Sequence, residues 1–310
     1  MHFTSVNDVP DLDQWVAKAL AFKANPVQHI QKGKKVGLIF FNPSLRTRLS
    51  SILAAQNLGA EPVALDISKD GWALEFGEEV RMDGNKAEHI KEAAAVMGTY
   101  FDLLAIRTFP SLTSREDDYS EQVLNSFIRY AGVPIVSLES ATGHPLQAFA
   151  DLITIKEEWE KEHRPKVVLT WAPHVKALPH AVPNSFAQWM NAAGMDLTIT
   201  HPKGYELSKE FTGNAPIVYD QKEALQDADF VYVKNWSSYE QYGQVLNQDE
   251  SWRLSQEHLQ VTNDAKVMHC LPVRRGVVMD DEVLDSSNAI HLKQAENRVY
   301  SAQTVLSELL

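Results

Sequence analysis

Two hydroxyl groups and two guanidinium groups lie within the five-residue segment Ser44-Leu45-Arg46-Thr47-Arg48. The apolar run before it, Val36 to Phe41, predicts a buried strand, and serine at position 44 favours the N-cap of a following helix. Such a helix would direct unpaired N–H groups at an anion, and Arg46 would add a bidentate fork. Arginines two positions apart point to different helix faces, so we expect only one at the ligand. The segment predicts a phosphate site, although an ordinary capped helix with solvated arginines has the same pattern.

Two further segments contain residue types that bind anions or polarise carbonyl groups. The first is Glu139 followed by His-Pro-Leu-Gln at 144–147, and the second is His-Cys-Leu-Pro-Val-Arg-Arg at 269–275. Arg107 follows the apolar run Leu103 to Ile106, and Arg298 lies near the C-terminus. Each residue alone also fits a structural role, since a single cysteine is most often a small buried hydrophobe and a terminal arginine is usually solvated.

Taken in order, the motifs S-x-R-T-R, H-P-x-Q and H-C-L-P-x-R-R, with the two separate arginines, resemble the carbamoyltransferase family, which includes the aspartate and ornithine transcarbamylases. The matches extend over nearly the whole chain. The carbamoyl-phosphate-binding residues that the resemblance implies are Ser44, Leu45, Arg46, Thr47, Trp72, Arg107, His144, Gln147, Cys270, Leu271 and Arg298.

The resemblance also implies how these residues share the chemistry. Arg107, His144 and Thr47 are expected to stabilise the oxyanion of a tetrahedral intermediate, and Gln147 to orient the carbamoyl nitrogen. Cys270 belongs to the expected catalytic set through its backbone groups, and covalent catalysis by its thiol is the less favoured alternative. Because the departing phosphate can accept the proton of the amine, we expect neither a cofactor nor a metal.

Composition limits the function without defining it. The 310 residues predict two domains, and 44% hydrophobic residues suffice for a substantial core. The net charge of −12 argues against nucleic acid as a partner. One cysteine allows no disulfide within the chain, and no apolar stretch has the length of a membrane span. We therefore expect a cytoplasmic protein without membrane or nucleic-acid partners.

Short apolar runs alternate with helical patterns in both halves of the chain. This alternation predicts an α/β fold with two doubly wound parallel-sheet domains joined by interdomain helices. The strands are expected at 36–41, 61–65, 103–106, 134–137, 166–170, 196–200, 230–233 and 267–269, and the main helices at 88–100, 121–131, 147–162, 185–193 and 294–309. We expect a carbamoyl-phosphate-binding domain at 1–145, with the helix at 294–310 packing back on it, and an amine-binding domain at 146–293.

Ligands of open α/β sheets bind beyond the carboxyl ends of the strands, so we expect the pocket between the two halves. The loop from Pro173 to Pro183 is expected to run extended in places. The resemblance further raises the possibility of a knot in the second domain, which periodicity does not reveal and which general fold rules make rare.

The residues expected at the amine substrate favour an acylated ornithine. Enzymes acting on free ornithine share a D-x-W-x-S-M-G segment, whereas this chain has Lys234-Asn235-Trp236-Ser237-Ser238, with a cation that would repel free ornithine. The chain instead resembles the N-acylornithine transcarbamylases, through Thr170-Trp171-Ala172-Pro173-His174, the doubled arginine of H-C-L-P-V-R-R, and Gly71-Trp72. The substrate contacts expected on that basis are Glu139, His174, Lys176, Lys234, Arg274 and Ala87.

The acyl group is expected to be succinyl rather than acetyl. In the resemblance, acetylornithine enzymes carry a glutamate where succinylornithine enzymes carry a proline, and this chain has Ala87 there. Alanine would not repel a succinyl carboxylate. By the same resemblance Trp72 reaches into the site of a neighbouring subunit, which predicts a homotrimer with shared active sites.

Three alternatives to an N-succinylornithine enzyme stay open at this point. One is an N-acetylornithine carbamoyltransferase, and another is a carbamoyltransferase for free ornithine, putrescine or aspartate. The third is a silent carbamoyl-phosphate-binding subunit, which is disfavoured because Arg46, Arg107 and His144 are all present. Binding of a nicotinamide dinucleotide is disfavoured because no G-x-G-x-x-G follows an expected strand.

Overall fold

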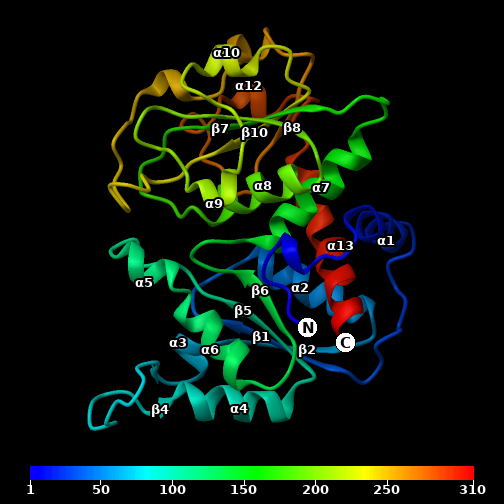
Figure 1. The fold of residues 1–310 in the computed structure, drawn as a ribbon. Coiled ribbons are helices and arrows are strands. Elements are labelled where there is room, and N and C mark those ends of the chain that lie inside the picture. Colours follow the sequence, from blue (N-terminus) through cyan, green and yellow to red (C-terminus); the bar gives the residue numbers. More distant parts are fainter. The chain divides into compact units, whose positions relative to one another are not determined.

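The structure, a computed structural model, describes residues 1–310 and divides into two compact units (Figure 1). Unit 1 comprises residues 1–111, 116–146 and 298–310, and unit 2 comprises residues 112–115 and 147–297. Each unit is an α/β structure around its own parallel sheet. The expected fold class, two doubly wound α/β domains, is confirmed.

Unit 1 contains a four-stranded parallel sheet in the order β2-β1-β5-β6. Every residue of β5 and β6 is buried, as expected for parallel strands covered on both faces. The strands are β1 (Lys35–Phe40), β2 (Glu61–Asp66), β3 (Leu74–Glu75), β4 (Glu88–His89), β5 (Leu103–Arg107) and β6 (Ile135–Glu139), of which β3 and β4 form a separate pair. The helices are η1 (Val6–Asp8), α1 (Leu12–Ala24), α2 (Arg46–Asn57), α3 (Ile67–Asp70), α4 (Ile90–Tyr100), α5 (Arg115–Tyr119) and α6 (Gln122–Tyr130).

Helices cover both faces of this sheet. Figure 1 shows α4 and α6 on one face, and α1, α2 and the last turns of α13 (His291–Leu309) on the other. Ile39, Leu104 and Ile106 of the sheet pack with Ile90 of α4 and Phe127 of α6 in one buried cluster. This apolar contact fixes the strands whose carboxyl ends carry the polar residues described below.

Unit 2 contains a five-stranded parallel sheet in the order β11-β10-β7-β8-β9. In Figure 1, α7, α8 and α9 lie on one face of this sheet, and α10 and α12 on the other. The strands are β7 (Lys166–Trp171), β8 (Asp196–Thr200), β9 (Ile217–Val218), β10 (Phe230–Lys234) and β11 (Lys266–Met268). The helices are α7 (Pro145–Glu158), α8 (Ala181–Ala192), α9 (Lys209–Thr212), α10 (Gln221–Leu225), η2 (Glu250–Trp252), α11 (Gln256–Leu259), α12 (Asp281–Leu284) and α13.

Four local expectations were wrong. The helix expected at 147–162 ends at Glu158. The helix expected from Ser44 begins at Arg46, with Leu45 at the N-cap and no side-chain cap. The helix expected from Glu88 begins at Ile90, because Glu88 and His89 pair with β3 and the His89 side chain caps the helix. The loop expected to reach Pro183 ends at His180, because α8 starts at Ala181 and proline is tolerated in a first helical turn.

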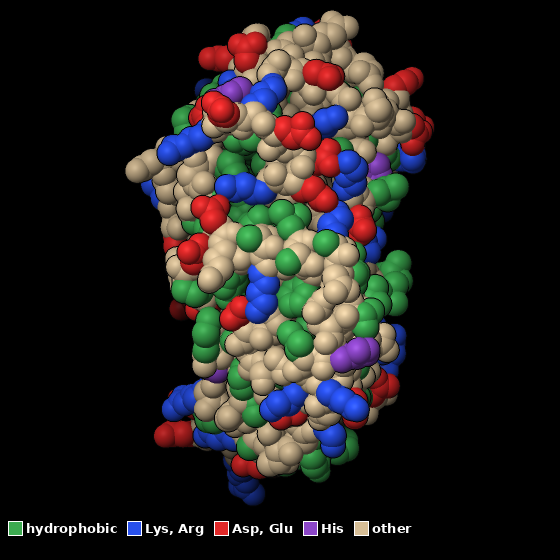
Figure 2. Space-filling model, turned by 90° about the vertical axis from the view of Figure 1, so that its right-hand side faces the viewer, with side chains coloured by type: hydrophobic (Ala, Val, Ile, Leu, Met, Phe, Trp, Pro, Cys, Tyr) green, Lys and Arg blue, Asp and Glu red, His purple; other side chains and the backbone are tan.

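No helix of the structure is long and apolar enough to span a membrane. Figure 2 shows acidic and basic side chains interspersed on the face that it presents.

Candidate functional site

The carboxyl ends of three neighbouring strands place polar residues side by side in unit 1. Phe40 at the end of β1 pairs with Arg107 at the end of β5, which pairs with Glu139 at the end of β6. The loop after β1 and the segment after β6 leave the sheet at this same edge. An edge of this kind is the usual ligand-binding place of an open α/β sheet.

The Arg107 guanidinium is held from two sides. Its Nε and Nη2 donate to Oε2 of Glu139 at 3.1 and 2.9 Å, and its Nη1 donates to the carbonyl oxygens of Asn42 at 3.2 Å and Pro43 at 3.0 Å. Arg107 and Glu139 are both buried, with 8% exposed. These four bonds engage four of the five N–H groups of an arginine and leave one on Nη2. The cradle therefore presents a fixed, oriented donor.

His144 lies beside this pair, directly before the first residue of α7. It is buried, and its Nε2 is 3.9 Å from Oε2 of Glu139. The resemblance implies a contact of Glu139 with the amine substrate. The structure shows in addition that Glu139 orients Arg107, a contact that residue types alone did not indicate.

The two arginines of the S-x-R-T-R segment lie in the first turn of α2 and have different environments. Nη2 of Arg48 donates to the carbonyl oxygen of Ala64 at 3.2 Å, so Arg48 is tied to the neighbouring strand. Arg46 has a buried Nε without a hydrogen-bond partner, although a buried donor normally has one. An anion at this helix start would supply that partner.

Thr47 and Arg298 meet on the same side of unit 1 although 251 positions separate them in sequence. Thr47 is buried, and its Oγ1 accepts from Nη2 of Arg298 at 2.6 Å. The last turns of α13 thus deliver a third guanidinium to the start of α2. Ser44 is half-buried and Leu45 is exposed in the loop just before the helix.

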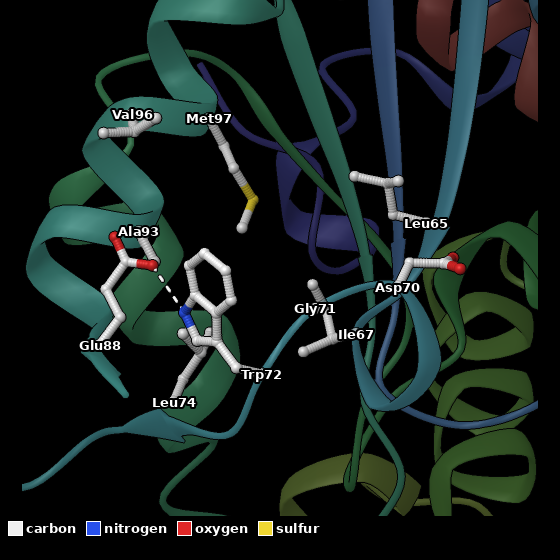
Figure 3. A pocket seen from close by; sticks show the side chains of 10 residues that line it. All are labelled: Leu65, Ile67, Asp70, Gly71, Trp72, Leu74, Glu88, Ala93, Val96 and Met97. Atoms are coloured by element: carbon white, nitrogen blue, oxygen red, sulfur yellow. Dashed lines mark hydrogen bonds between the residues drawn. The ribbon is translucent and has the colours of Figure 1, made fainter. Parts of the chain in front are cut away.

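Trp72 lies on the loop after α3 and is 58% exposed. Its Nε1 donates to Oε2 of Glu88 at 2.9 Å, and Figure 3 shows the Met97 side chain extending toward its indole ring. The apolar pocket here has a volume of about 200 Å³. Ala87 is exposed and lies directly before β4. Its N–H donates to the carbonyl oxygen of Ala73, next to Trp72, at 3.2 Å.

The remaining residues expected at carbamoyl phosphate lie in unit 2. Gln147 is buried, and its Nε2 donates to Oδ1 of Asp151 at 2.7 Å. Cys270 is buried and forms no disulfide, and Leu271 has a positive φ of 58° followed by a cis peptide bond to Pro272. The contribution of Gln147, Cys270 and Leu271 to carbamoyl phosphate binding stays a prediction.

The cationic residues expected at the amine substrate follow three adjacent strands of unit 2. His174 follows β7, Lys234 ends β10 and Arg274 follows β11. Burial is the main reason that the pKa of His174 is lowered, and the positive charges of Lys234 and Arg274 lower it further. Lys176 is exposed, and its N–H donates to Nδ1 of His174 at 3.1 Å. Lys176, Lys234 and Arg274 thus form a positively charged group beside His174, whose lowered pKa favours the neutral ring near pH 7.

The second arginine of the H-C-L-P-V-R-R segment has a different environment. Arg275 donates to both carboxylate oxygens of Asp285, at 2.9 and 2.7 Å, and lies 3.4 Å from Asp281. Arg275 is therefore neutralised by surface carboxylates, whereas the charge of Arg274 acts on His174.

Two residues of the site escaped sequence analysis, namely Asp151 and Gln294. Asp151 follows Gln147 by four positions on a helix, a spacing that places both on one face and could have indicated the contact. Gln294 is 143 positions from Asp151, and no local signal connects them.

Comparison with known proteins agrees with this arrangement. The family model described as the aspartate/ornithine carbamoyltransferase carbamoyl-P binding domain matches residues 1–157, and the model of the Asp/Orn binding domain matches residues 179–309. An N-succinylornithine carbamoyltransferase of Bacteroides thetaiotaomicron is 50% identical, over 99% of this chain and 98% of its own. An N-acetylornithine carbamoyltransferase of Xanthomonas axonopodis pv. citri is 35% identical, over 99% of this chain and 96% of its own.

A solved structure has the same fold. It is an N-acetyl-L-ornithine transcarbamylase in which a glutamate is replaced by alanine, complexed with carbamyl phosphate and N-succinyl-L-norvaline. Its TM-score is 0.95 at 35% sequence identity, and the match covers 100% of both chains. The expected resemblance is confirmed, and the chain belongs to the aspartate/ornithine carbamoyltransferase family.

Proposed function

We propose that this chain transfers the carbamoyl group of carbamoyl phosphate to the δ-amine of N-succinyl-L-ornithine, giving N-succinyl-L-citrulline and phosphate, in arginine biosynthesis. The observation that carries carbamoyl transfer is the Arg107 cradle, in which a buried guanidinium retains one oriented donor. The full-length identity of 50% to an N-succinylornithine carbamoyltransferase supports the choice of acceptor.

Unit 1 supplies the groups that suit a small dianion with a polarised carbonyl. Arg46, the start of α2 and Arg298 bind the phosphate, with Ser44, Leu45 and Thr47 contributing hydroxyl and N–H donors. The remaining N–H of Arg107, together with His144, meets the carbonyl oxygen, where negative charge develops during the reaction. These donors are held before the substrate arrives, so little reorganisation is needed when the charge appears.

The reaction needs a neutral amine. An alkyl amine has a pKa of about 10.4, so deprotonation at pH 7 costs about 4 to 5 kcal/mol. Nearby positive charge from Arg274 and the phosphate-binding arginines disfavours the ammonium form. The nitrogen then attacks the carbonyl carbon and forms the C–N bond. The bond from carbon to the phosphate oxygen breaks, and the departing phosphate takes the proton from nitrogen.

The positively charged group of unit 2 suits an acceptor that is anionic at its far end. Lys234 and Arg274 would attract carboxylates and repel the free α-ammonium of ornithine, and the neutral ring of His174 would add a hydrogen bond. Glu139, Lys176 and Ala87 complete the proposed contacts with the amine substrate. An N-succinyl group adds a carboxylate that these cations can pair, whereas an N-acetyl group does not.

The runner-up is an N-acetylornithine carbamoyltransferase, favoured by the relatives at 35% identity. Against it stands Ala87, which we propose occupies the place of the glutamate found in acetylornithine enzymes. The solved relative in which a glutamate is replaced by alanine was complexed with an N-succinyl compound, which fits this assignment. An enzyme for free ornithine is less favoured because Lys234 and Arg274 would repel its α-ammonium group. A silent binding subunit is less favoured because the Arg107 cradle is intact.

The proposal is tested by assaying citrulline-group formation from carbamoyl phosphate with ornithine, acetylornithine and succinylornithine. We expect succinylornithine to have the highest kcat/KM. In Ala87→Glu a carboxylate would face the succinyl carboxylate, and like charges about 4 Å apart cost about 4 kcal/mol at an effective dielectric of 20. The kcat/KM for succinylornithine should therefore fall far more than that for acetylornithine.

Ala87→Gln is the matched control, since it adds the same bulk without charge and should change the preference little. Equal losses for both acceptors in Ala87→Glu would show that position 87 does not face the acyl tail. A wild-type preference for acetylornithine would overturn the succinyl assignment, and no transfer to any acceptor would overturn the function.

We further infer from the resemblance that the protein is a homotrimer in which Trp72 serves the site of a neighbouring subunit. Its indole is largely exposed on its own unit, which leaves it available to a partner chain.

A further inference from the structure

A chain of buried hydrogen bonds in unit 2 connects Gln147 to the turn at Leu271. Oδ1 of Asp151 accepts from Nε2 of Gln147 at 2.7 Å and from Nε2 of Gln294 at 2.6 Å. Oε1 of Gln294 accepts from the backbone N–H of His269 at 2.9 Å, and Nδ1 of His269 accepts from the N–H of Leu271 at 2.8 Å. Gln147, Asp151 and Gln294 are each at most 1% exposed. Water therefore does not compete for the two bonds to Asp151.

The donor and acceptor types along this series of hydrogen bonds fix the orientation of each side-chain amide. The backbone N–H of His269 can only donate, so Gln294 must turn Oε1 toward it and Nε2 toward Asp151. Gln147 likewise donates from Nε2 to Oδ1 of Asp151, which fixes the orientation of its amide. The other end of the Gln147 amide is therefore Oε1, the oxygen that can accept hydrogen bonds.

We infer that Asp151 and Gln294 are positioning residues that make Gln147 an acceptor for the NH₂ of the carbamoyl group. This inference rests on the proposed function, which assigns Gln147 to the carbamoyl nitrogen. A carbamoyl group donates two N–H bonds, whereas the similarly sized acetyl group has a methyl that donates none. The buried carboxylate thus determines a specificity for carbamoyl phosphate over acetyl phosphate without contacting either.

Helices α7 and α13 also share a second hydrogen bond that serves as a matched control. Thr154 of α7 accepts from Nδ2 of Asn297 of α13 at 2.9 Å, about one turn beyond the bond from Gln294 to Asp151. Thr154 and Asn297 are both fully buried. Thr154→Val removes a comparable hydrogen bond between α7 and α13 and leaves Gln147 and Asp151 intact.

The experiment measures the KM for carbamoyl phosphate and the inhibition constant of acetyl phosphate. In Asp151→Ala the Gln147 amide loses its anchor, and we expect the KM to rise about 10-fold, as for one lost hydrogen bond of about 1.4 kcal/mol. The inhibition constant of acetyl phosphate should stay within about twofold. Asp151→Asn retains an oxygen that can accept both bonds and should keep the KM within about threefold of wild type.

Gln294→Met keeps the Asp151 carboxylate but removes its hydrogen bond with Gln294. It should also raise the KM for carbamoyl phosphate, and it provides the test if Asp151→Ala does not fold. The inference is overturned if Thr154→Val raises the KM as much as Asp151→Ala, or if acetyl phosphate weakens in parallel with carbamoyl phosphate. Failure of the proposed function is a separate result, because the wild type would then transfer carbamoyl to no acceptor. In that case calorimetric binding of carbamoyl phosphate to the same variants still tests the positioning.

Discussion

At the scale of single residues, the buried pair of Arg107 and Glu139 combines orientation with charge. A buried charge that loses its partner is strongly destabilising, commonly by about 3 to 5 kcal/mol, whereas removing both partners costs less. Each partner therefore compensates the buried charge of the other through the same contacts that orient Arg107 at the site. The two effects of the pair can be separated by mutation.

Arg107→Ala should cut turnover by about 10²- to 10³-fold, because an oxyanion donor is lost. It should also lower the free energy of unfolding, since Glu139 is left buried and unpaired. The double variant Arg107→Ala/Glu139→Ala should recover part of the stability and none of the turnover. Steady-state kinetics and urea denaturation measure the two effects. Wild-type turnover in Arg107→Ala would remove this residue from the proposed chemistry.

At the scale of secondary-structure elements, His180 ties the start of α8 to the loop after β10. Its buried Nε2 lies 2.9 Å from the carbonyl oxygen of Ser237, so the neutral ring donates to that oxygen. Burial lowers the pKa of His180 to about 4, below the ordinary value of 6.5. The loop held in this way begins directly after Lys234, so the His180 contact supports the position of a proposed substrate residue.

This lowered pKa predicts a pH dependence of stability. Between about pH 4 and pH 6.5 the unfolded chain binds a proton at His180 that the folded chain does not, so stability falls as pH decreases through this range. The loss is complete below about pH 4 and amounts to about 3 kcal/mol. In His180→Gln this component should be absent, while other histidines titrate as before. Identical pH profiles of the unfolding free energy in the two proteins would show that His180 titrates normally.

The elements themselves were largely predictable from the sequence, and the exceptions have physical reasons. The apolar runs of β5 and β7 are typical of strands buried on both faces. By contrast, β3 and β4 have two residues each and exist only through their pairing with one another, which no local pattern encodes. The start of α2 was misplaced because serine favours an N-cap only where its hydroxyl can reach the next N–H groups, and here the helix begins later.

For the candidate site, the sequence indicated residue types but not most of the contacts between them. Residue types indicated Arg46, Arg107 and Arg298 because guanidinium groups bind phosphate. Their neighbours could not be predicted in the same way. The contact of Arg107 with Glu139 depends on strand register, and that of Asp151 with Gln294 on the packing of two helices far apart in sequence.

At the scale of the whole molecule, the proposed homotrimer makes each site depend on two subunits. Trp72 is held on its own unit by one side-chain hydrogen bond, to Glu88 (Figure 3). An exposed hydrogen bond of this kind contributes little, so it opposes a contact of the indole with a partner subunit only weakly.

Trp72→Ala should reduce carbamoyl-phosphate use while each subunit remains folded. When it is mixed with Arg107→Ala subunits, some sites receive an intact Arg107 from one subunit and an intact Trp72 from its neighbour. Activity should therefore reappear in mixed oligomers and not in either variant alone. Tyr100→Ala changes another exposed aromatic of unit 1 and should leave activity unchanged. Verified mixed oligomers without activity would restrict Trp72 to its own subunit.

The division of α13 between the two units has a consequence for how the chain is made. Residues 298–310 belong to unit 1, where Gln303 accepts a hydrogen bond from Asn57 at 3.1 Å and Arg298 reaches Thr47. Chains are synthesised from the N-terminus, and domains generally fold as they emerge from the ribosome. Unit 1 begins first and yet lacks its closing helix until residues 298–310 have been synthesised. Its sheet must therefore wait, incompletely covered, for most of translation, and it is during that interval that the nascent chain most needs protection by chaperones.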